Sequence, residues 1–257
     1  MGKVRLEYTH DGAVARITLD DGKGNVLDNI MMNELLALFD EFSHKPDLKL
    51  ITFEGAGKHF SFGASVEEHT REKVAGMLAT FHKMFYKITG LSIPTMAKIS
   101  GQCLGGGHEL ALVCNFMFAD KTAFIGQPEI MLGVFAPPAS IMLPLKIGSA
   151  RAEELLLTGK SIPAGMALEA GLLNGIFEDK EAMNTGVDEW IEKHILPKSA
   201  ISLRYAVKAS RTQFNHVLTG RLKEIERMFL EDLMATHDAN EGIHSFMEKR
   251  KPVWTNS

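Results

Sequence analysis

Short stretches of alternating hydrophobic and polar residues recur through the first two-thirds of the chain and predict β-strands. The first two stretches flank the dipeptide Asp11-Gly12, which is typical of a turn between paired strands. Pro94 opens a later strand, and the Gly55-Ala-Gly57 turn follows an earlier one. The expected strands cover residues 4–8, 14–19, 48–53, 95–99, 116–119 and 123–125.

Other stretches carry apolar residues at helical spacing and predict helices. Asp28 is a suitable N-cap for the first helix, which is expected to end at Pro46. Ser149 is expected to cap a later helix, and Ser161 another that has Pro163 in its first turn. A further helix is predicted over residues 66–88, and the first helix presents the apolar residues Met31, Leu35, Leu38, Phe39 and Phe42.

The pattern changes after Phe177. Residues 182–248 are almost continuously helical in their periodicity, and Pro197 is the main break. The chain therefore combines a region of alternating strands and helices with a helical C-terminal part. This combination predicts an α/β fold.

Composition narrows the class of protein without naming a function. The chain has 257 residues, of which 45% are hydrophobic and 23% are charged, as in an ordinary globular protein with one large domain or one domain and an appendage. The net charge of −4 argues against nucleic acid or an anionic membrane as the main partner. With no apolar stretch of membrane-spanning length, we expect a soluble, cytoplasmic protein.

Several familiar motifs fail on inspection. The two cysteines, Cys103 and Cys114, lie among apolar residues and form no Cys-x-x-Cys pair, so we expect buried thiols and no zinc site. The segment around Lys58 resembles a phosphate-binding loop but lacks its first glycine and its Ser or Thr. His108-Glu109 begins like a zinc-protease helix, but Leu112 replaces the second histidine.

Two polar groups remain as candidates for chemistry. Gly105-Gly106-Gly107 precedes Glu109 at a predicted helix start, where free backbone N–H groups attract negative charge and favour an ionised Glu109. Glu129 lies in an apolar segment, where loss of water would raise its pKa and suit it to act as a general acid. Plainer interpretations stay open: the glycines can serve tight packing, Glu109 the helix dipole, and Glu129 an exposed turn.

Four ordered segments resemble the enoyl-CoA hydratase (crotonase) family, at the family's spacing and across essentially the whole chain. They are residues 58–66 (KHFSFGASV), 101–111 (GQCLGGGHELA), 124–130 (FIGQPEI) and 241–250 (EGIHSFMEKR). The resemblance implies a crotonase-like spiral of strand–strand–helix repeats. It also implies a core over residues 1–196 and, over residues 197–257, a helical oligomerisation region that forms a homotrimer or a hexamer of two trimers.

The resemblance also implies the reaction and its residues. An acyl-CoA thioester would bind with its oxygen against the backbone N–H groups of Ala64 and Gly106, which meet the negative charge of an enolate. Glu109 would activate water, and Glu129 would exchange a proton with a substrate carbon. No cofactor and no metal are implied, since coenzyme A is part of the substrate. Coenzyme A contacts are expected at Lys58, Ser65, Val66, Phe246 and Lys249, the last two from a neighbouring subunit.

The chain departs from the family at the loop that contacts the substrate. Ordinary hydratases carry a Pro-Gly-Ala-Gly-Gly-like run where this chain has Ala136-Pro-Pro-Ala-Ser140, and Pro137 has no N–H group to offer to water. Phe135, Pro137 and Pro138 are therefore expected to form a stiff, apolar pocket wall. This variant is similar to the cyclohexa-1,5-dienecarbonyl-CoA hydratases of anaerobic benzoyl-CoA degradation, and neutral drift in a turn is the alternative.

The resemblance leaves three other functions to weigh. The chain could be a straight-chain enoyl-CoA hydratase of fatty-acid oxidation. An isomerase usually manages with one glutamate, so the presence of both Glu109 and Glu129 argues against it. The same two glutamates argue against a non-catalytic binding protein with this fold.

Overall fold

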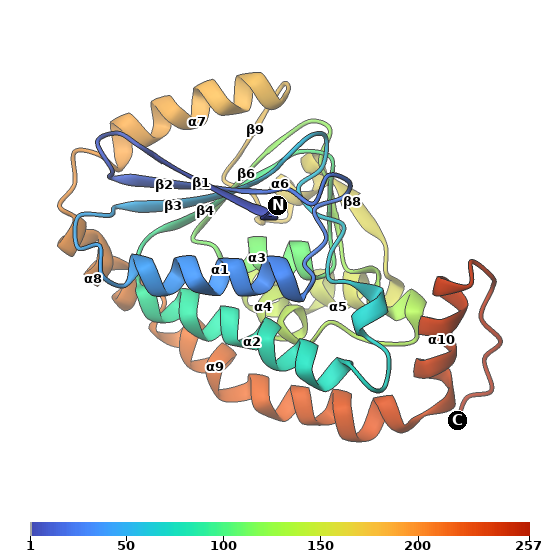
Figure 1. Cartoon of the computed structure of the whole chain (residues 1–257). Coiled ribbons are helices and arrows are strands. Elements are labelled where there is room, and N and C mark those ends of the chain that lie inside the picture. The colour runs from blue at the N-terminus through green and yellow to red at the C-terminus, as the bar shows by residue number, and fades with distance from the viewer. Residues whose placement is uncertain (1) are drawn as a thin grey trace.

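A computed structural model describes residues 2–257, which form two β-sheets packed against helices (Figure 1). The larger sheet has six strands in the order β1-β2-β3-β4-β6-β9, and every neighbouring pair is parallel except β1 and β2. Helices lie on both faces of this sheet, as parallel sheets require. Its strands are β1 (Val4–Thr9), β2 (Val14–Leu19), β3 (Leu50–Gly55), β4 (Thr95–Ile99), β6 (Phe116–Asp120) and β9 (Gly175–Phe177).

The smaller sheet has the order β5-β7-β8 and consists of β5 (Gln102–Leu104), β7 (Phe124–Gly126) and β8 (Ser161–Pro163). Single bridges from Leu27 to Ala64 and from Ser61 to Cys103 continue it toward the N-terminal segments. Successive turns of the chain thus run along the larger sheet, then along the smaller one, and then into a helix. This arrangement confirms the expected spiral of strand–strand–helix repeats.

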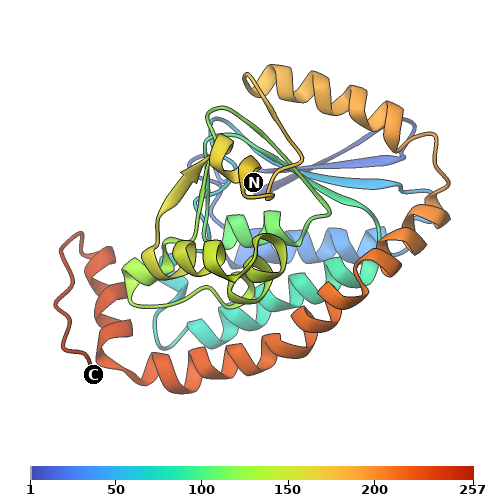
Figure 2. The ribbon, with the colours of Figure 1, turned by 180° about the vertical axis from the view of Figure 1, so that it is seen from behind.

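Helices α1, α2 and α9 lie in successive layers on one side of the larger sheet, and α7 covers its other side (Figures 1 and 2). The main core lies between the sheets and these helices and includes Phe39, Phe53, Phe60 and Phe85. The α-helices are α1 (Asn29–Phe42), α2 (Val74–Leu91), α3 (Gly106–Val113), α4 (Pro137–Ile147), α5 (Ser149–Thr158), α6 (Ala164–Glu169), α7 (Lys180–His194), α8 (Ala200–Ser210), α9 (Thr212–Arg227) and α10 (His237–Met247).

The C-terminal helices pack on the rest of the chain. Leu218, Leu222 and Phe229 belong to the same hydrophobic cluster as the strands and α1. A π-helical turn, η3 (Met228–Asp232), and a 3₁₀ turn, η4 (Leu233–Ala235), then direct the chain into α10. The division at residue 196 and the role of the tail in oligomers stay predictions.

One predicted helix starts later than expected. The helix predicted over residues 66–88 is a 3₁₀ turn, η1 (Val66–Glu68), followed by a loop and then by α2 from Val74. The intervening residues are polar, and His69 Nδ1 closes its own turn on the Ser65 carbonyl at 2.7 Å. Such local bonds compete with helix continuation, so the apolar face of α2 begins only at Val74.

One of the three predicted helix N-caps is confirmed, and two are wrong. Asp28 caps α1 as predicted, and its carboxylate accepts from the Met31 N–H at 3.0 Å. The predictions for Ser149 and Ser161 are wrong. Ser149 is already helical, behind Gly148 as N-cap, and Ser161 pairs in β8 before the Pro163 N-cap. Also, α1 ends at Phe42, before Pro46.

Candidate functional site

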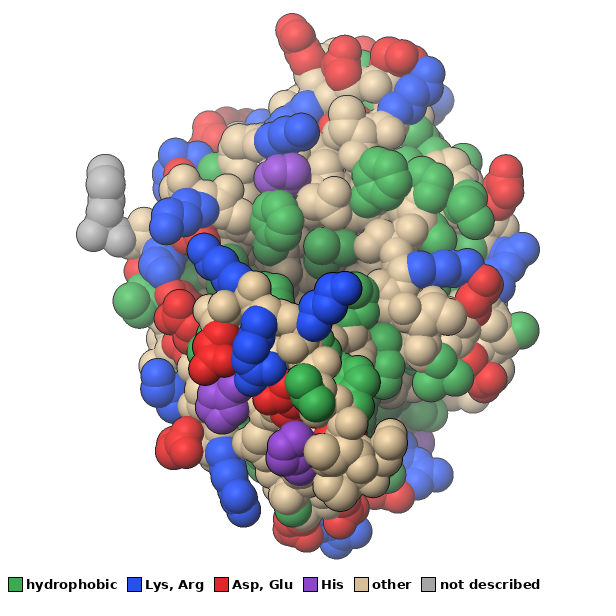
Figure 3. Space-filling model, turned by 90° about the vertical axis from the view of Figure 1, so that its right-hand side faces the viewer, with side chains coloured by type: hydrophobic (Ala, Val, Ile, Leu, Met, Phe, Trp, Pro, Cys, Tyr) green, Lys and Arg blue, Asp and Glu red, His purple; other side chains and the backbone are tan. Residues whose placement is uncertain are grey.

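A cavity of about 820 Å³ lies where the ends of several repeats meet beneath α10. Its wall joins the loop after β3, the start of α3, the 3₁₀ turn η2 (Pro128–Leu132), the start of α4 and the end of α10. Figure 3 views the molecule from the α10 side, where Lys and Arg side chains border a hollow with hydrophobic side chains. The predicted site residues that line the cavity are Ala64, Ser65, Val66, Gly106, Glu109, Glu129, Phe135, Pro137, Phe246 and Lys249.

Two predicted residues lie elsewhere. Pro138 is buried as the second residue of α4 and does not line the cavity, so its expected place in the pocket wall is wrong. A helix turns its successive residues to different sides, and Pro137 takes the cavity side instead. Lys58 is exposed on the loop after β3, outside the cavity wall.

Phe246 and Lys249 lie at the chain's own cavity. The expectation was that they reach the site of a neighbouring subunit. Instead α10 packs over η1 and η2 of the same chain, and this fold-back carries both residues to the wall. Within residues 2–257, the cavity therefore has this wall without a second copy.

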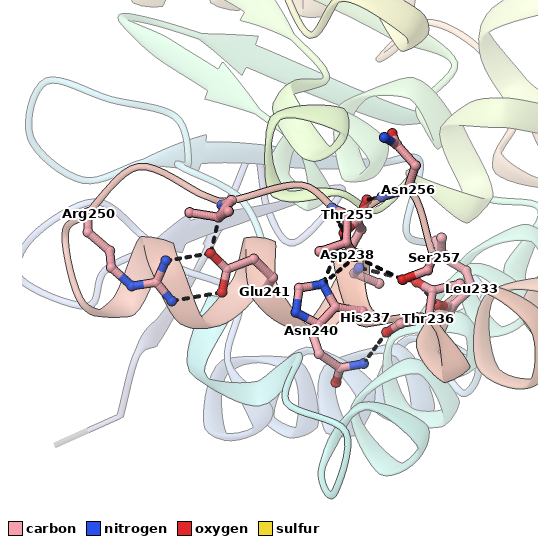
Figure 4. A network of polar contacts seen from close by, with 12 residues as sticks. Leu233, Thr236, His237, Asp238, Asn240, Glu241, Arg250, Thr255, Asn256 and Ser257 are labelled. Atoms are coloured by element: carbon pink, nitrogen blue, oxygen red, sulfur yellow. Dashed lines mark hydrogen bonds and ion pairs between the residues drawn. The ribbon is translucent and has the colours of Figure 1, made fainter.

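Figure 4 shows the polar network that holds the segment after α10 in place. The Glu241 carboxylate accepts from Arg250 Nη2 at 2.7 Å and from the Val253 N–H at 2.8 Å. The Asp238 carboxylate accepts from the N–H groups of Thr255 and Asn256, each at 2.8 Å. Arg250 lowers the pKa of Glu241 to about 2, so this clasp persists at all but strongly acidic pH.

Two backbone amides face the cavity from different repeats. Within residues 2–257, the N–H groups of Ala64 and Gly106 donate no hydrogen bond to the protein. A Cβ atom on Gly106 would lie 3.0 Å from Ala64 N, so only glycine keeps the space in front of that amide open. Gly105, at φ +51°, is the N-cap of α3, and Gly106 is the first residue of the helix, so its N–H has no acceptor within the helix. Paired donors of this kind can hold an oxyanion.

Glu109 lies in the first turn of α3 and is 3% exposed. Its carboxylate accepts from the Ala139 N–H at 2.8 Å, the first N–H of α4 after the two prolines at its start. Burial and the charge of Glu129 nevertheless raise the pKa of Glu109 well above its usual range. The expected preference for an ionised Glu109 at a helix start is therefore outweighed by the loss of water.

Glu129 lies on η2 and is partly exposed to the cavity. Its Oε1 is so close to the backbone that a Cβ atom on Gly105 would approach it to 2.8 Å. Burial raises the pKa of Glu129 to about 7, which confirms the direction expected from its apolar surroundings. Two carboxyl groups with raised pKa values on one cavity wall form a pair that holds a proton near neutral pH.

Sequence reasoning missed four groups of this site. The Ala139 N–H carries no side-chain signal, because its donation depends on where α4 begins. His69 lines the cavity wall beside Ser65, and burial lowers its pKa. Gln127 and His108 stand inside the motifs quoted above, but only the fold shows that the Gln127 amide lies between His108 and Glu129.

Comparison with known proteins agrees with this geometry. A family model described as enoyl-CoA hydratase/isomerase matches residues 9–257. The chain is 41% identical over 254 residues to the cyclohexa-1,5-dienecarbonyl-CoA hydratase of Thauera aromatica, and the match covers 99% of this chain and 96% of the relative. It is 34% identical over 248 residues to a probable enoyl-CoA hydratase of Mycobacterium bovis, with 95% of each chain covered.

Solved structures are similar over the full length. An enoyl-CoA hydratase from Bacillus anthracis superposes with a TM-score of 0.78 at 28% identity, over 99% of this chain and 100% of the other. An enoyl-CoA hydratase from Mycobacterium avium subsp. paratuberculosis superposes with a TM-score of 0.87 at 22% identity, over 100% of both chains, and this likeness shows the fold alone. Within residues 2–257, no helix is long and apolar enough to cross a membrane.

Proposed function

The chain belongs to the enoyl-CoA hydratase/isomerase family, and we propose that it adds water to cyclohexa-1,5-diene-1-carbonyl-CoA in anaerobic benzoyl-CoA degradation. It is a hydro-lyase of the enoyl-CoA hydratase type. The observation that carries the proposal is a single cavity wall with two unpaired amides and two carboxyl groups whose pKa values are raised. The loop from Phe135 to Ser140 and the 41% identity support the cyclic substrate.

The two amides supply electrostatic stabilisation. Addition of water to a conjugated thioester moves negative charge onto the carbonyl oxygen. The N–H groups of Ala64 and Gly106 come from the loop after β3 and from the start of α3, and they are free to donate to that oxygen. In such sites one donor typically contributes about 10²- to 10³-fold to turnover.

The two carboxyl groups divide the proton transfers. The pair shares one proton near neutral pH, and hydration begins with that proton on Glu129, which leaves Glu109 ionised. Glu109, whose carboxylate accepts from the Ala139 N–H, then takes a proton from water as the oxygen attacks the substrate carbon. Glu129 gives its proton to the substrate carbon that receives hydrogen, and its O–H bond breaks as the C–H bond forms. A pKa of about 7 suits Glu129 to this exchange near neutral pH.

The acyl pocket favours a rigid ring. Phe135 and Pro137 line the cavity, and Phe135 packs edge-on against Phe229 with ring centroids 5.3 Å apart. Pro137 has no N–H group for water, so fewer polar groups lie along this wall. A ring loses little conformational freedom when it binds, whereas a flexible acyl chain loses more.

Coenzyme A contacts and assembly complete the proposal. Ser65, Val66, Phe246 and Lys249 line the cavity, and we expect them to contact the coenzyme A part of the thioester. Lys58 lies on the surface, seven residues before Ser65 in the sequence. We expect a homotrimer or a hexamer, because α8 leaves Ile201 and Tyr205 more than half exposed on one face.

One assay panel tests the reaction and the substrate together. Purified protein is incubated separately with crotonyl-CoA and with cyclohexa-1,5-diene-1-carbonyl-CoA, and the gain of one water is followed by mass spectrometry. We expect a higher kcat/KM for the cyclic substrate. Comparable kcat/KM values for the two thioesters would contradict the cyclic substrate and favour a straight-chain enoyl-CoA hydratase. If neither thioester is hydrated, the proposed hydratase activity is wrong.

A further inference from the structure

Two buried polar side chains, Gln127 and His108, lie in a row behind the Glu129 carboxyl group. The Gln127 amide is 3.0 Å from each Glu129 carboxylate oxygen on one side and 3.3 Å from His108 Nδ1 on the other. His108 is 0% exposed and Gln127 is 1% exposed, so neither exchanges these contacts for water. The mechanism above assigns no task to either residue.

The hydrogen-bonding capacity of the three groups fixes their orientation. Once Glu129 has given up its proton, its carboxylate can only accept, so in that state the Gln127 NH₂ group faces Glu129 and the Gln127 oxygen faces His108. His108 Nδ1 must then carry the proton. His108 Nε2 has no hydrogen-bond partner of good geometry within residues 2–257, although the Gly126 carbonyl lies near the ring, and an unpaired lone pair is tolerated there more readily than an unpaired N–H. Both arguments select the neutral Nδ1–H tautomer.

We propose that His108 is a positioning residue: its Nδ1–H group holds the Gln127 amide in the orientation that donates to Glu129, which stabilises the carboxylate left when Glu129 gives its proton to the substrate carbon. This inference rests on the role of Glu129 in the proposed function. Hydrogen bonds to a charged group are worth more than those to a neutral one, so the Gln127 contact strengthens as the O–H bond of Glu129 breaks.

Other charges on the cavity wall do not duplicate this effect. Glu109, on α3, opposes ionisation of Glu129 because the two carboxylates repel. His69, Lys249 and Arg250 also line the cavity, from the loop after η1 and from the end of α10. Arg250 is already paired with Glu241. All four remain when His108 is replaced, so the consequences of that replacement belong to the His108–Gln127–Glu129 chain.

The tautomer is tested in the unaltered protein. In ¹⁵N-histidine spectra of the full chain, His108 is expected to show a protonated Nδ1 and a bare Nε2, with no titration between mildly acidic and mildly alkaline pH. Burial, which lowers the pKa of His108 to about 3, predicts the same constancy. A protonated Nε2, or a ring that titrates in this range, would overturn the proposal.

The kinetic test compares His108→Phe with His108→Gln. Phenylalanine fills the ring's space without a donor, and we expect kcat to fall about 10- to 100-fold, the contribution of a hydrogen bond to a charged group, with KM unchanged. Loss of the donor raises the pKa of Glu129, so the alkaline limb of the kcat profile should move to higher pH. Glutamine restores an N–H donor and should recover part of kcat and the original limb.

Two controls separate the possible failures. His82→Phe removes another buried histidine whose Nε2 is unpartnered, on α2 beside Glu226, and should change stability but not the pH profile. If Glu129→Gln is inactive while His108→Phe keeps wild-type kcat and pH profile, the positioning role is wrong and the proposed function stands. If Glu129→Gln is active, the proposed role of Glu129 itself fails.

Discussion

Gly106→Ala tests the two-amide arrangement by adding one methyl group and removing nothing. The new Cβ would lie 3.0 Å from Ala64 N and 3.2 Å from both Ala64 Cβ and Phe81 Cζ. An oxygen that accepts from an amide N–H sits about 2.9 Å from the nitrogen, so the methyl group and the thioester oxygen compete for one place. Gly106 is the first residue of α3 and has no positive φ, so alanine meets no backbone strain.

The size of the effect follows from the loss of one donor. Blocking the Ala64 N–H should lower kcat/KM about 10²- to 10³-fold, or about 2.7–4 kcal/mol of transition-state stabilisation. Stability should change little, because Phe81 is a side chain that can move by a few tenths of an ångström while alanine suits a helix better than glycine does. The assay is the loss of absorbance of the conjugated thioester, alongside thermal unfolding by circular dichroism.

Gly90→Ala is the matched control. Gly90 lies in the last turn of α2, is exposed, and has nothing within 4 Å of its Cβ position. Its alanine variant should keep wild-type kcat/KM. If folded Gly106→Ala stays within threefold of the wild type, about 0.6 kcal/mol, the Ala64 amide does not face the reacting oxygen and the reasoning is refuted.

Four further outcomes are expected. Glu109→Gln and Glu129→Gln should each lower kcat about 10²- to 10⁴-fold, while calorimetry should show that each variant still binds the hydrated thioester. The loss of kcat in the double variant should be far smaller than the two single losses multiplied together, because the two residues act as a unit. Wild-type turnover in either single variant would contradict the acid–base pair. Folding raises the pKa of Glu129 from 4.5 to about 7, so the folded state holds more protons and loses stability as pH rises through that window. Glu129→Gln has no ionisable group at this position, so its melting temperature relative to the wild type should rise as the pH increases between those values. A difference in melting temperature that does not change with pH would contradict the raised pKa. Light scattering should give a trimer or hexamer at micromolar concentration, and a monomer would contradict the assembly. Replacing residues 136–140 with Pro-Gly-Ala-Gly-Gly should reduce the ratio of kcat/KM for the cyclic thioester to kcat/KM for crotonyl-CoA. If this ratio does not change, Pro137 and Pro138 do not determine the preference for the cyclic substrate.

The sequence was most informative where a local pattern decides local structure. Asp28 capped α1 as predicted, and the six predicted strands lie within two residues of observed ones. The N-cap predictions for Ser149 and Ser161 were wrong because serine is favoured at helix N-caps but does not by itself determine where a helix begins. Gly148, at φ +77°, is the N-cap of α5 instead, and pairing with β7 holds Ser161 in a strand.

The residues of the candidate site were predicted from its motifs, but the pKa of Glu109 was not. The positive end of α3 should favour an ionised Glu109, but the sequence cannot say how completely Glu109 is buried or that Glu129 stands close enough to repel it. Similarly, the resemblance assigns Phe246 and Lys249 to a neighbouring subunit, whereas α10, which follows the π-helical turn Met228–Asp232, brings both residues to the wall of the chain's own cavity. Such facts arise from packing between distant segments.

The free amides of this site have a consequence for mutational mapping. An alanine scan replaces side chains, yet the groups at Ala64, Gly106 and Ala139 are backbone N–H groups, and two of the three residues are already alanine. Such a scan would therefore not detect the Ala64 and Ala139 N–H groups, which donate to the thioester oxygen and to the Glu109 carboxylate. Exchange of the individual amide bonds for esters, which deletes one N–H at a time, would map what side-chain substitution leaves invisible.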